Sequence, residues 1–246
     1  MTRQVRIAQH VGVDGCRAGW LAVTHDGAGL EHRLFASIAD LANAFRDAET
    51  ILIDIPIGLP WADVPIRPCD RLARRVLGKT RKSSVFPVPC REALAACDLD
   101  RARTLNKACV GRSVGAQTWG ISPKIAEVDG FLLGNRGDHA GIREIHPEVC
   151  FWALAGRRPM MHGKTTREGR EERLRVLQRY EASAGSFLNA ILSATLRKDV
   201  QPDDVLDATV AFVTAEARHG ELASLSGEPS HDVVGLPMEM LYLKVW

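Results

Sequence analysis

Alternating apolar and polar positions mark two short strands in the first quarter of the chain. Residues 11–14 read Val-Gly-Val-Asp, residues 51–54 read Ile-Leu-Ile-Asp, and glycine or proline follows each stretch closely. Side chains of a strand alternate between its two faces, so each aspartate lies on the face opposite the residue before it. Runs this apolar are typical of strands covered on both faces in a parallel sheet. The pattern predicts two buried strands that each end in an aspartate.

Further strands and a helix are expected around these two. Residues 20–24 favour a hairpin partner of the first strand, and residues 32–35 a third strand. Ser37 occupies an N-cap position before a short helix, and a further short strand follows at residues 142–146. This order resembles the opening of ribonuclease H-like domains. We predict an α/β fold with a ribonuclease H-like mixed sheet, in which a three-strand meander and a helix lead to parallel fourth and fifth strands.

Chain length favours one domain with helical additions. At 246 residues the chain is long for one small domain and short for two full ones. We expect a single ribonuclease H-like domain over residues 1–246, with a basic, mostly helical insertion at about 60–120 and a helical segment at about 150–200.

The overall composition is that of a globular protein with little net charge. The formal net charge of +2 is too small to indicate nucleic acid by itself. Six scattered cysteines without a C-x-x-C pair argue against structural zinc and favour reduced core thiols. No run of about 18 apolar residues occurs, and residues 1–6 lead into a short strand instead of an apolar signal core. We expect a cytoplasmic protein without a membrane partner.

The two strand-end aspartates are candidate metal ligands. Open α/β sheets bind ligands beyond the carboxyl ends of their strands, so adjacent strands would bring Asp14 and Asp54 together. Neighbouring carboxylates repel unless they share a proton or a cation, and hard oxygen ligands suit Mg²⁺ or Mn²⁺. For either aspartate alone, capping of its own turn is the favoured interpretation. The matching pair favours a metal site.

A late helix adds two further acids. Residues 202–215 predict a helix in which Asp207 shares a face with Asp204 and with three alanines that would pack close to a sheet. Capping of the helix dipole is the simple interpretation of Asp204. Asp207 is different, because a carboxylate facing a sheet is costly unless a cation meets it.

A helix expected over residues 123–132, with proline in its first turn, carries Lys124. Glu144 in the fifth strand is a candidate added ligand, and an edge-strand salt bridge with Arg143 or Lys124 is the favoured interpretation for Glu144 alone.

A basic run from residue 67 to 82 is a candidate phosphate-binding patch. It holds seven lysines and arginines against one aspartate, Asp70, with a second, Asp63, in its flank. Such side chains release counterions when they neutralise phosphates, but a solvated helical face is an equally good interpretation. The candidate substrate-binding residues are Arg17, Arg74, Arg75, Arg81, Lys82, Ser83 and Ser84.

A glycine-lysine motif at residues 163–165 superficially resembles a phosphate loop. Arg158 stands where that loop requires glycine, and no apolar strand precedes it. No Walker-type nucleotide site is expected.

Six motifs in order resemble the domain-of-unknown-function family 429, whose members are regarded as predicted ribonuclease H-like nucleases. They lie at residues 11–20, 54–58, 83–87, 123–129, 144–148 and 204–208. The resemblance implies a ribonuclease H-like fold with one acid on the first strand, one on the fourth and one or two on the last helix. These roles fall to Asp14, Asp54, Asp207 and Asp204. The first helix lacks an evident glutamate, which makes the arrangement similar to that of Holliday-junction resolvases.

The resulting hypothesis is phosphodiester hydrolysis of nucleic acid, RNA or DNA, by a nuclease that uses two Mg²⁺ or Mn²⁺ ions. Asp14 would bridge the ions, and Lys124 or an arginine of the basic run would hold the substrate phosphate. The expected catalytic residues are Asp14, Asp54, Asp207 and Lys124, and the expected metal ligands are Asp14, Asp54, Glu144, Asp204 and Asp207. The alternatives are a nucleotide phosphatase or phosphotransferase of the same fold and a non-catalytic binding domain.

Overall fold

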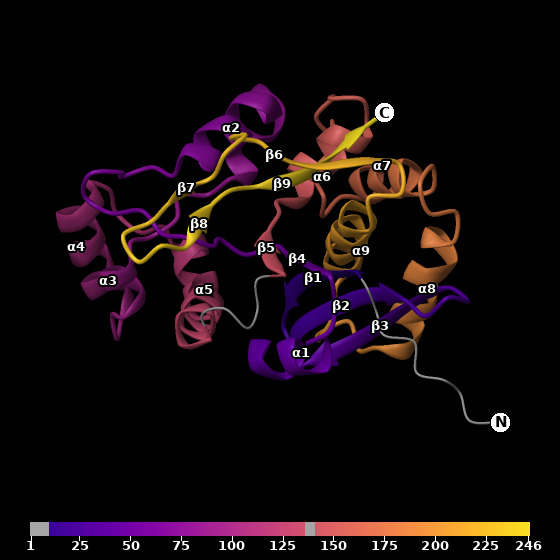
Figure 1. The fold of residues 1–246 in the computed structure, drawn as a ribbon, viewed down its shortest axis with the longest axis horizontal. Coiled ribbons are helices and arrows are strands. Elements are labelled where there is room, and N and C mark those ends of the chain that lie inside the picture. The colour runs from indigo at the N-terminus through magenta and orange to yellow at the C-terminus, as the bar shows by residue number, and fades with distance from the viewer. Residues whose placement is uncertain (1–9, 136–140) are drawn as a thin grey trace.

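A five-stranded mixed sheet lies at the centre of the fold (Figure 1). The computed structural model describes residues 10–135 and 141–246, so residues 1–6 lie outside the described residues. The sheet order is β3-β2-β1-β4-β5; β1 pairs with β4 and β4 with β5 in parallel, and the β1-β2-β3 meander is antiparallel. The strands are β1 (His10–Cys16), β2 (Gly19–His25), β3 (Leu30–Phe35), β4 (Thr50–Ile53) and β5 (Ile142–Glu144). The predicted α/β fold, with a mixed sheet of ribonuclease H type and a helical insertion, is confirmed.

Helices connect and cover this sheet. Ser37 caps the first helix and accepts a hydrogen bond from the Asp40 amide, as its position predicts. Figure 1 shows α3, α4 and α5 at one end of the molecule and α8 at the other. The helices are α1 (Ile38–Ala44), α2 (Pro68–Arg81), the 3₁₀ turn η1 (Lys82–Ser84), α3 (Arg91–Leu94), α4 (Leu99–Val110), α5 (Ala116–Gly134), α6 (Pro147–Leu154), α7 (Arg167–Leu177), α8 (Ala184–Ala194) and α9 (Pro202–Glu216).

Two short strand pairs follow α9 along the chain. Strand β6 (Gly220–Ser224) pairs with β9 (Leu241–Val245), and β7 (Ser230–His231) pairs with β8 (Pro237–Met238), both antiparallel. No helix within residues 10–135 and 141–246 combines the length and the apolar character needed to cross a membrane.

The sheet separates two hydrophobic layers. Val11 and Val13 of β1 pack with Ile51 and Ile53 of β4 on the face covered by α1 and α5. The opposite face carries Cys16 and is covered by α6 to α9. The alternation along β1 and β4 is therefore as predicted, because strand side chains alternate between faces.

Gly12 allows helix α9 to lie directly against β1. A Cβ atom at this position would stand 2.0 Å from the Phe212 amide nitrogen and 2.3 Å from the Ala208 carbonyl oxygen. Both distances are far below van der Waals contact, so only glycine fits without a shift of the helix. The small residues on this face of α9 and the glycine of β1 together bring the helix backbone close to the sheet.

Helix α5 differs from the prediction at its beginning. The helix starts at Ala116, after the N-cap Gly115, and Pro123 lies inside it instead of in its first turn. Proline there lacks the amide that would bond the preceding turn, a defect that normally weakens a helix interior. The burial of Ile125 and Val128 against the sheet outweighs that defect. The helix therefore continues through a residue that is typical of a helix start.

A candidate carboxylate and lysine site

One pocket, of about 380 Å³, lies at the carboxyl ends of β1 and β4. Strands, the insertion, α5, α9 and the segment before α7 all contribute to its walls. The polar and charged lining residues are Asp14, Asp54, Arg81, Ser83, Ser84, Gln117, Lys124, His146, Glu148, Lys164, Asp204 and Asp207.

The strand register places Asp14 and Asp54 side by side. Val13 pairs with Ile53, and the Asp54 amide donates to the Val13 carbonyl oxygen over 3.0 Å. Each aspartate follows one of these paired residues, so both leave the sheet on the face covered by α9. Asp14 is 7% exposed.

Helix α9 supplies two more carboxylates. Asp207 is 1% exposed and lies one turn after Asp204, whose carboxylate accepts a hydrogen bond from the Gln201 amide at the helix start. Asp204 therefore caps the helix while it lines the pocket. Asp207 shares its helix face with Ala208 and Ala211, which pack on the sheet.

Burial and repulsion from neighbouring acids make Asp14, Asp54 and Asp204 hard to ionise. Burial, followed by the nearby Asp54 and Asp207 charges, raises the pKa of Asp14 well above its usual value. The same causes, burial first and then Asp207, raise the pKa of Asp54 to about 7. Burial also raises the pKa of Asp204 to about 6. The site gathers more negative charge than its immediate surroundings compensate.

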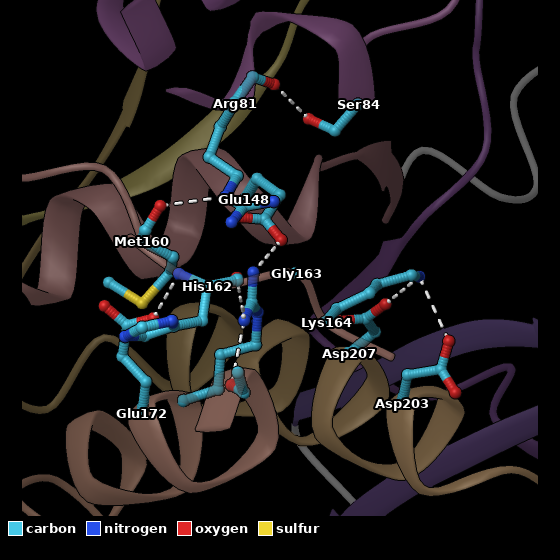
Figure 2. A network of polar contacts seen from close by, with 12 residues as sticks. Arg81, Ser84, Glu148, Met160, His162, Gly163, Lys164, Glu172, Asp203 and Asp207 are labelled. Carbon is cyan, nitrogen blue, oxygen red and sulfur yellow. Dashed lines mark hydrogen bonds and ion pairs between the residues drawn. The ribbon is translucent and has the colours of Figure 1, made fainter. Parts of the chain in front are cut away.

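Lys164 provides a cation in direct contact with these acids. Its Nζ lies 2.7 Å from Asp207 Oδ2 and 3.6 Å from Asp203 Oδ2 (Figure 2). The Asp207 charge, and then those of Asp14 and Asp54, raise the pKa of Lys164 above its usual value against the opposing effect of burial. The 163–165 motif forms no phosphate loop, but its lysine lines the pocket. The sequence signal was a lysine in a basic stretch, which could not be assigned to these acids before the fold was known.

Two charged side chains hold the segment that carries Lys164. Arg81 of the insertion donates to the carbonyl oxygens of Met160 and Met161, each over 2.8 Å. From the other side, Glu172 accepts the amides of Met161 and His162 (Figure 2). The segment is thereby tied to α2 and α7.

Lys124 of α5 also lines the pocket. Its Nζ donates to the Gly19 carbonyl oxygen over 2.5 Å and stands 4.3 Å above the Trp20 ring centre. The Trp20 indole in turn donates to Glu127, one helical turn after Lys124. These contacts hold the ammonium at the pocket edge.

His146 and Glu148 line the pocket although the sequence did not single them out. His146 Nδ1 accepts from the Glu148 amide, and Nε2 faces the Ser84 carbonyl oxygen at 3.4 Å. Burial lowers the pKa of His146. One Glu148 oxygen bonds the buried Arg173, whereas the other, Oε2, is buried without a hydrogen-bond partner among the described residues. Both residues fall in the 144–148 motif, in which only Glu144 was expected to be a ligand.

Glu144 lies outside the pocket, and the expectation that it joins the metal ligands needs correction. Glu144 pairs with Ile53 across the parallel strands, so its side chain leaves on the face opposite Asp54. There it bonds the buried Arg67 at 2.5 Å and accepts the Ile57 amide at 2.7 Å. Both carboxylate oxygens are thus engaged. The partner is Arg67, and neither Arg143 nor Lys124.

The predicted substrate-binding residues divide into two groups. Arg81, Ser83 and Ser84 line the pocket. Arg74 instead donates twice to the Val85 carbonyl oxygen. The three remaining residues are exposed and lie outside the pocket lining: Arg17, Arg75 and Lys82. Part of the basic run therefore serves internal contacts.

The carboxylate oxygens of the pocket acids do not all lie within metal-binding distance of one another. Among the described residues, two trios of His, Cys, Asp or Glu have ligand atoms all within 4.8 Å of one another, and neither includes a pocket acid. Asp207 Oδ1 is buried and has no hydrogen-bond partner among the described residues. The other oxygen, Oδ2, accepts a hydrogen bond from Lys164. The acids line one space, and a lysine neutralises part of their charge.

Sheet and pocket together define the class: an α/β protein with a sheet of ribonuclease H type and carboxylates gathered at its strand ends. A model of the family described as "Protein of unknown function (DUF429)" matches residues 12–231, and the chain belongs to this family. The family resemblance of the sequence is thereby confirmed. No curated protein and no solved structure matches the chain.

Proposed function

We propose that the protein is a divalent-metal-dependent hydrolase of phosphodiesters, with nucleic acid as its substrate class. The supporting observation is the gathering of Asp14, Asp54 and Asp207 around one pocket, with Asp207 Oδ1 buried and without a hydrogen-bond partner among residues 10–135 and 141–246. A buried carboxylate oxygen with no donor fits a cation as its missing partner.

The donor set suits Mg²⁺ or Mn²⁺. The pocket offers carboxylate oxygens, and none of its described lining residues is a cysteine. Asp14, Asp54 and Asp207 would hold the metal, with Asp204 as an additional donor. A bound divalent ion would lower the pKa of a water molecule and stabilise negative charge on phosphate oxygens.

Cations and hydroxyls of the pocket walls are suited to orient a phosphate group. Lys124 and Lys164 enter from different elements, and Ser83 brings a hydroxyl from η1, whereas the Ser84 hydroxyl already donates to the Arg81 carbonyl oxygen. Ammonium groups and hydroxyls donate hydrogen bonds to phosphate oxygens. The lysines also reduce repulsion between the carboxylates and an anionic substrate.

The test is hydrolysis of a labelled single strand, a duplex and a branched junction with Mg²⁺, with Mn²⁺ and with a chelator. Asp14→Asn and Asp54→Asn should abolish divalent-dependent cleavage, whereas the exposed Asp63→Asn should retain it. Full activity of Asp14→Asn, or activity in the chelator, would overturn the metal-dependent function.

A nucleotide phosphatase or phosphotransferase is the second candidate. It is favoured by the internal contacts of Arg67, Arg74 and Arg81, which leave less of the basic run for a long polyanion. Titration of an oligonucleotide and a mononucleotide at two salt concentrations separates the candidates. A nuclease should bind the oligonucleotide better, and its salt dependence should decrease by roughly one unit of slope for each phosphate-binding side chain removed in the Arg75→Gln and Lys82→Gln variants. Equal, salt-insensitive binding of both ligands would favour the nucleotide enzyme.

A further inference from the structure

Two cysteines and a glutamate meet in the insertion, away from the carboxylate pocket. Cys90, Glu92 and Cys109 each offer one ligand atom, and these three atoms all lie within 4.8 Å of one another. Cys90 precedes α3, Glu92 lies in its first turn, and Cys109 lies in the last turn of α4. The sequence separates the cysteines by 19 positions, so no metal-binding spacing was visible.

The three side chains of this trio differ in how far solvent reaches them. Cys90 is 0% exposed, Cys109 is half-buried and Glu92 is exposed. A hydrogen bond from its own backbone, and then bonds from the two thiols, lower the pKa of Glu92. Both sulfur atoms are thus directed toward one carboxylate that solvent reaches. An ion could enter on the Glu92 side.

A second trio in the described residues shows the opposite situation. Cys69, Asp70 and Glu144 are also mutually within 4.8 Å, but all three are buried. The Arg67 guanidinium contacts every one of them, with Nη2 3.1 Å from the Cys69 sulfur, 3.0 Å from Asp70 and 2.5 Å from Glu144. The place of a cation is already filled by arginine.

The arginine beside the first trio is directed elsewhere. Arg91 follows Cys90 directly, yet its guanidinium bonds Asp129 at 2.7 Å and Asp232 at 2.7 Å. Arg91 therefore ties α3 to α5 and to the β7–β8 turn, instead of occupying the space between the sulfur atoms and Glu92.

The hydrophobic core next to this trio is small, so a bound cation could stabilise the packing of α3 on α4. The buried members of the hydrophobic cluster under α3 and α4 are small: Cys90, Ala93, Ala102, Val110 and Val114. The larger Leu99, Leu105 and Trp119 pack against it but are only partly buried. Small side chains bury little apolar area and so contribute little stability. A metal ion that joins the two helices would add the stability that such a core lacks.

We propose that Cys90, Glu92 and Cys109 bind a thiophilic divalent cation, with Zn²⁺ as the expected ion. Cysteine sulfur and carboxylate oxygen are both zinc ligands, and three protein ligands leave the fourth position to water. This site is separate from the pocket and does not depend on the proposed hydrolysis. Its effect would be to fasten α3 to α4.

Co²⁺ titration of the full chain, under a phosphine reductant, tests the proposal because cobalt bound to thiolate absorbs strongly in the near ultraviolet. We expect this band with one Co²⁺ per chain, and its loss when Zn²⁺ is added. Cys109→Ser should weaken binding at least about a hundredfold, since even the loss of a ligand's hydrogen-bond partner costs 10–100-fold. Ions held by the pocket carboxylates would give no such band.

The matched control is Cys97→Ser, because Cys97 is exposed, lies between α3 and α4 and is outside the trio. It should keep the band unchanged. Glu92→Gln retains both thiols and should still weaken binding about tenfold or more, which keeps the proposal testable if Cys109→Ser unfolds. Absence of the band in the natural protein, or its persistence in Cys109→Ser, would overturn the proposal.

Discussion

Replacement of Lys164 by methionine is the most informative perturbation of the pocket. The substitution keeps the length of the side chain and removes the ammonium that lies 2.7 Å from Asp207 Oδ2. At that distance two unit charges attract by about 6 kcal/mol at an effective dielectric of 20 and by about 1.5 kcal/mol in bulk water. The Asp207 side chain is 2% exposed and that of Lys164 is 43% exposed. Solvent therefore screens the ion pair, so the loss of stability on removing the ammonium should lie near the smaller of these two energies.

We expect the metal-free Lys164→Met protein to lose about 1–3 kcal/mol in free energy of unfolding. For a protein of this size a loss of about 2 kcal/mol lowers Tm by about 4–8 °C. Chemical and thermal denaturation in a chelator measure both quantities. Lys164→Arg keeps the charge and should recover most of the loss, and Lys198→Met, at an exposed lysine, should change neither quantity.

The same substitution should strengthen divalent-ion binding, because the ammonium and the ion compete for the same carboxylates. We expect the affinity of Lys164→Met for Mn²⁺ to rise at least about tenfold, which corresponds to about 1.4 kcal/mol. Isothermal titration or the electron paramagnetic resonance signal of free Mn²⁺ gives the affinity. Unchanged stability together with unchanged or weaker Mn²⁺ binding would refute the view that Lys164 neutralises the acids of the pocket.

Three further predictions concern the sheet and its acids. Asp14→Asn should leave the metal-free fold equally stable or more stable, because it relieves repulsion among raised-pKa carboxylates; a lower Tm would identify Asp14 as a structural acceptor. The folded-state pKa of Asp54, about 7, lies above its unfolded value near 4, so this group destabilises the metal-free protein increasingly as pH rises from about 4 to 7. The stability advantage of Asp54→Asn over the natural protein should therefore grow by at most about 1.4 kcal/mol per pH unit in that window and stay constant above it; an advantage that shrinks with pH would contradict the assigned shift. Gly12→Ala should cost about 3 kcal/mol or more in a denaturant titration, because its Cβ would meet the backbone of α9 at 2.0 Å, whereas Gly29→Ala, with nothing within 4 Å, should cost little.

Local patterns in the sequence determined the sheet and the first acids. Period-two alternation fixes which face each strand residue occupies, so Asp14 and Asp54 could be assigned to one face and one end before the fold was known. The serine cap of α1 and the small-residue face of α9 are equally local signals. These features depend on residues close to each other in the chain, and a periodic pattern records them directly.

Tertiary structure decided which charged residues meet. Glu144 and Asp54 belong to neighbouring strands, but the pairing of Glu144 with Ile53 sends them to opposite faces, and a one-residue difference in register would have reversed that outcome. Lys164 reaches Asp207 across 43 positions, and Arg67 reaches Glu144 across 77. No local period encodes such contacts, because they depend on how loops and helices from distant parts of the chain pack. The strand ends and their acids could therefore be read from the sequence, whereas the counter-ion of those acids, the role of the basic run and the meeting of Cys90 with Cys109 follow only from the packing of the whole chain.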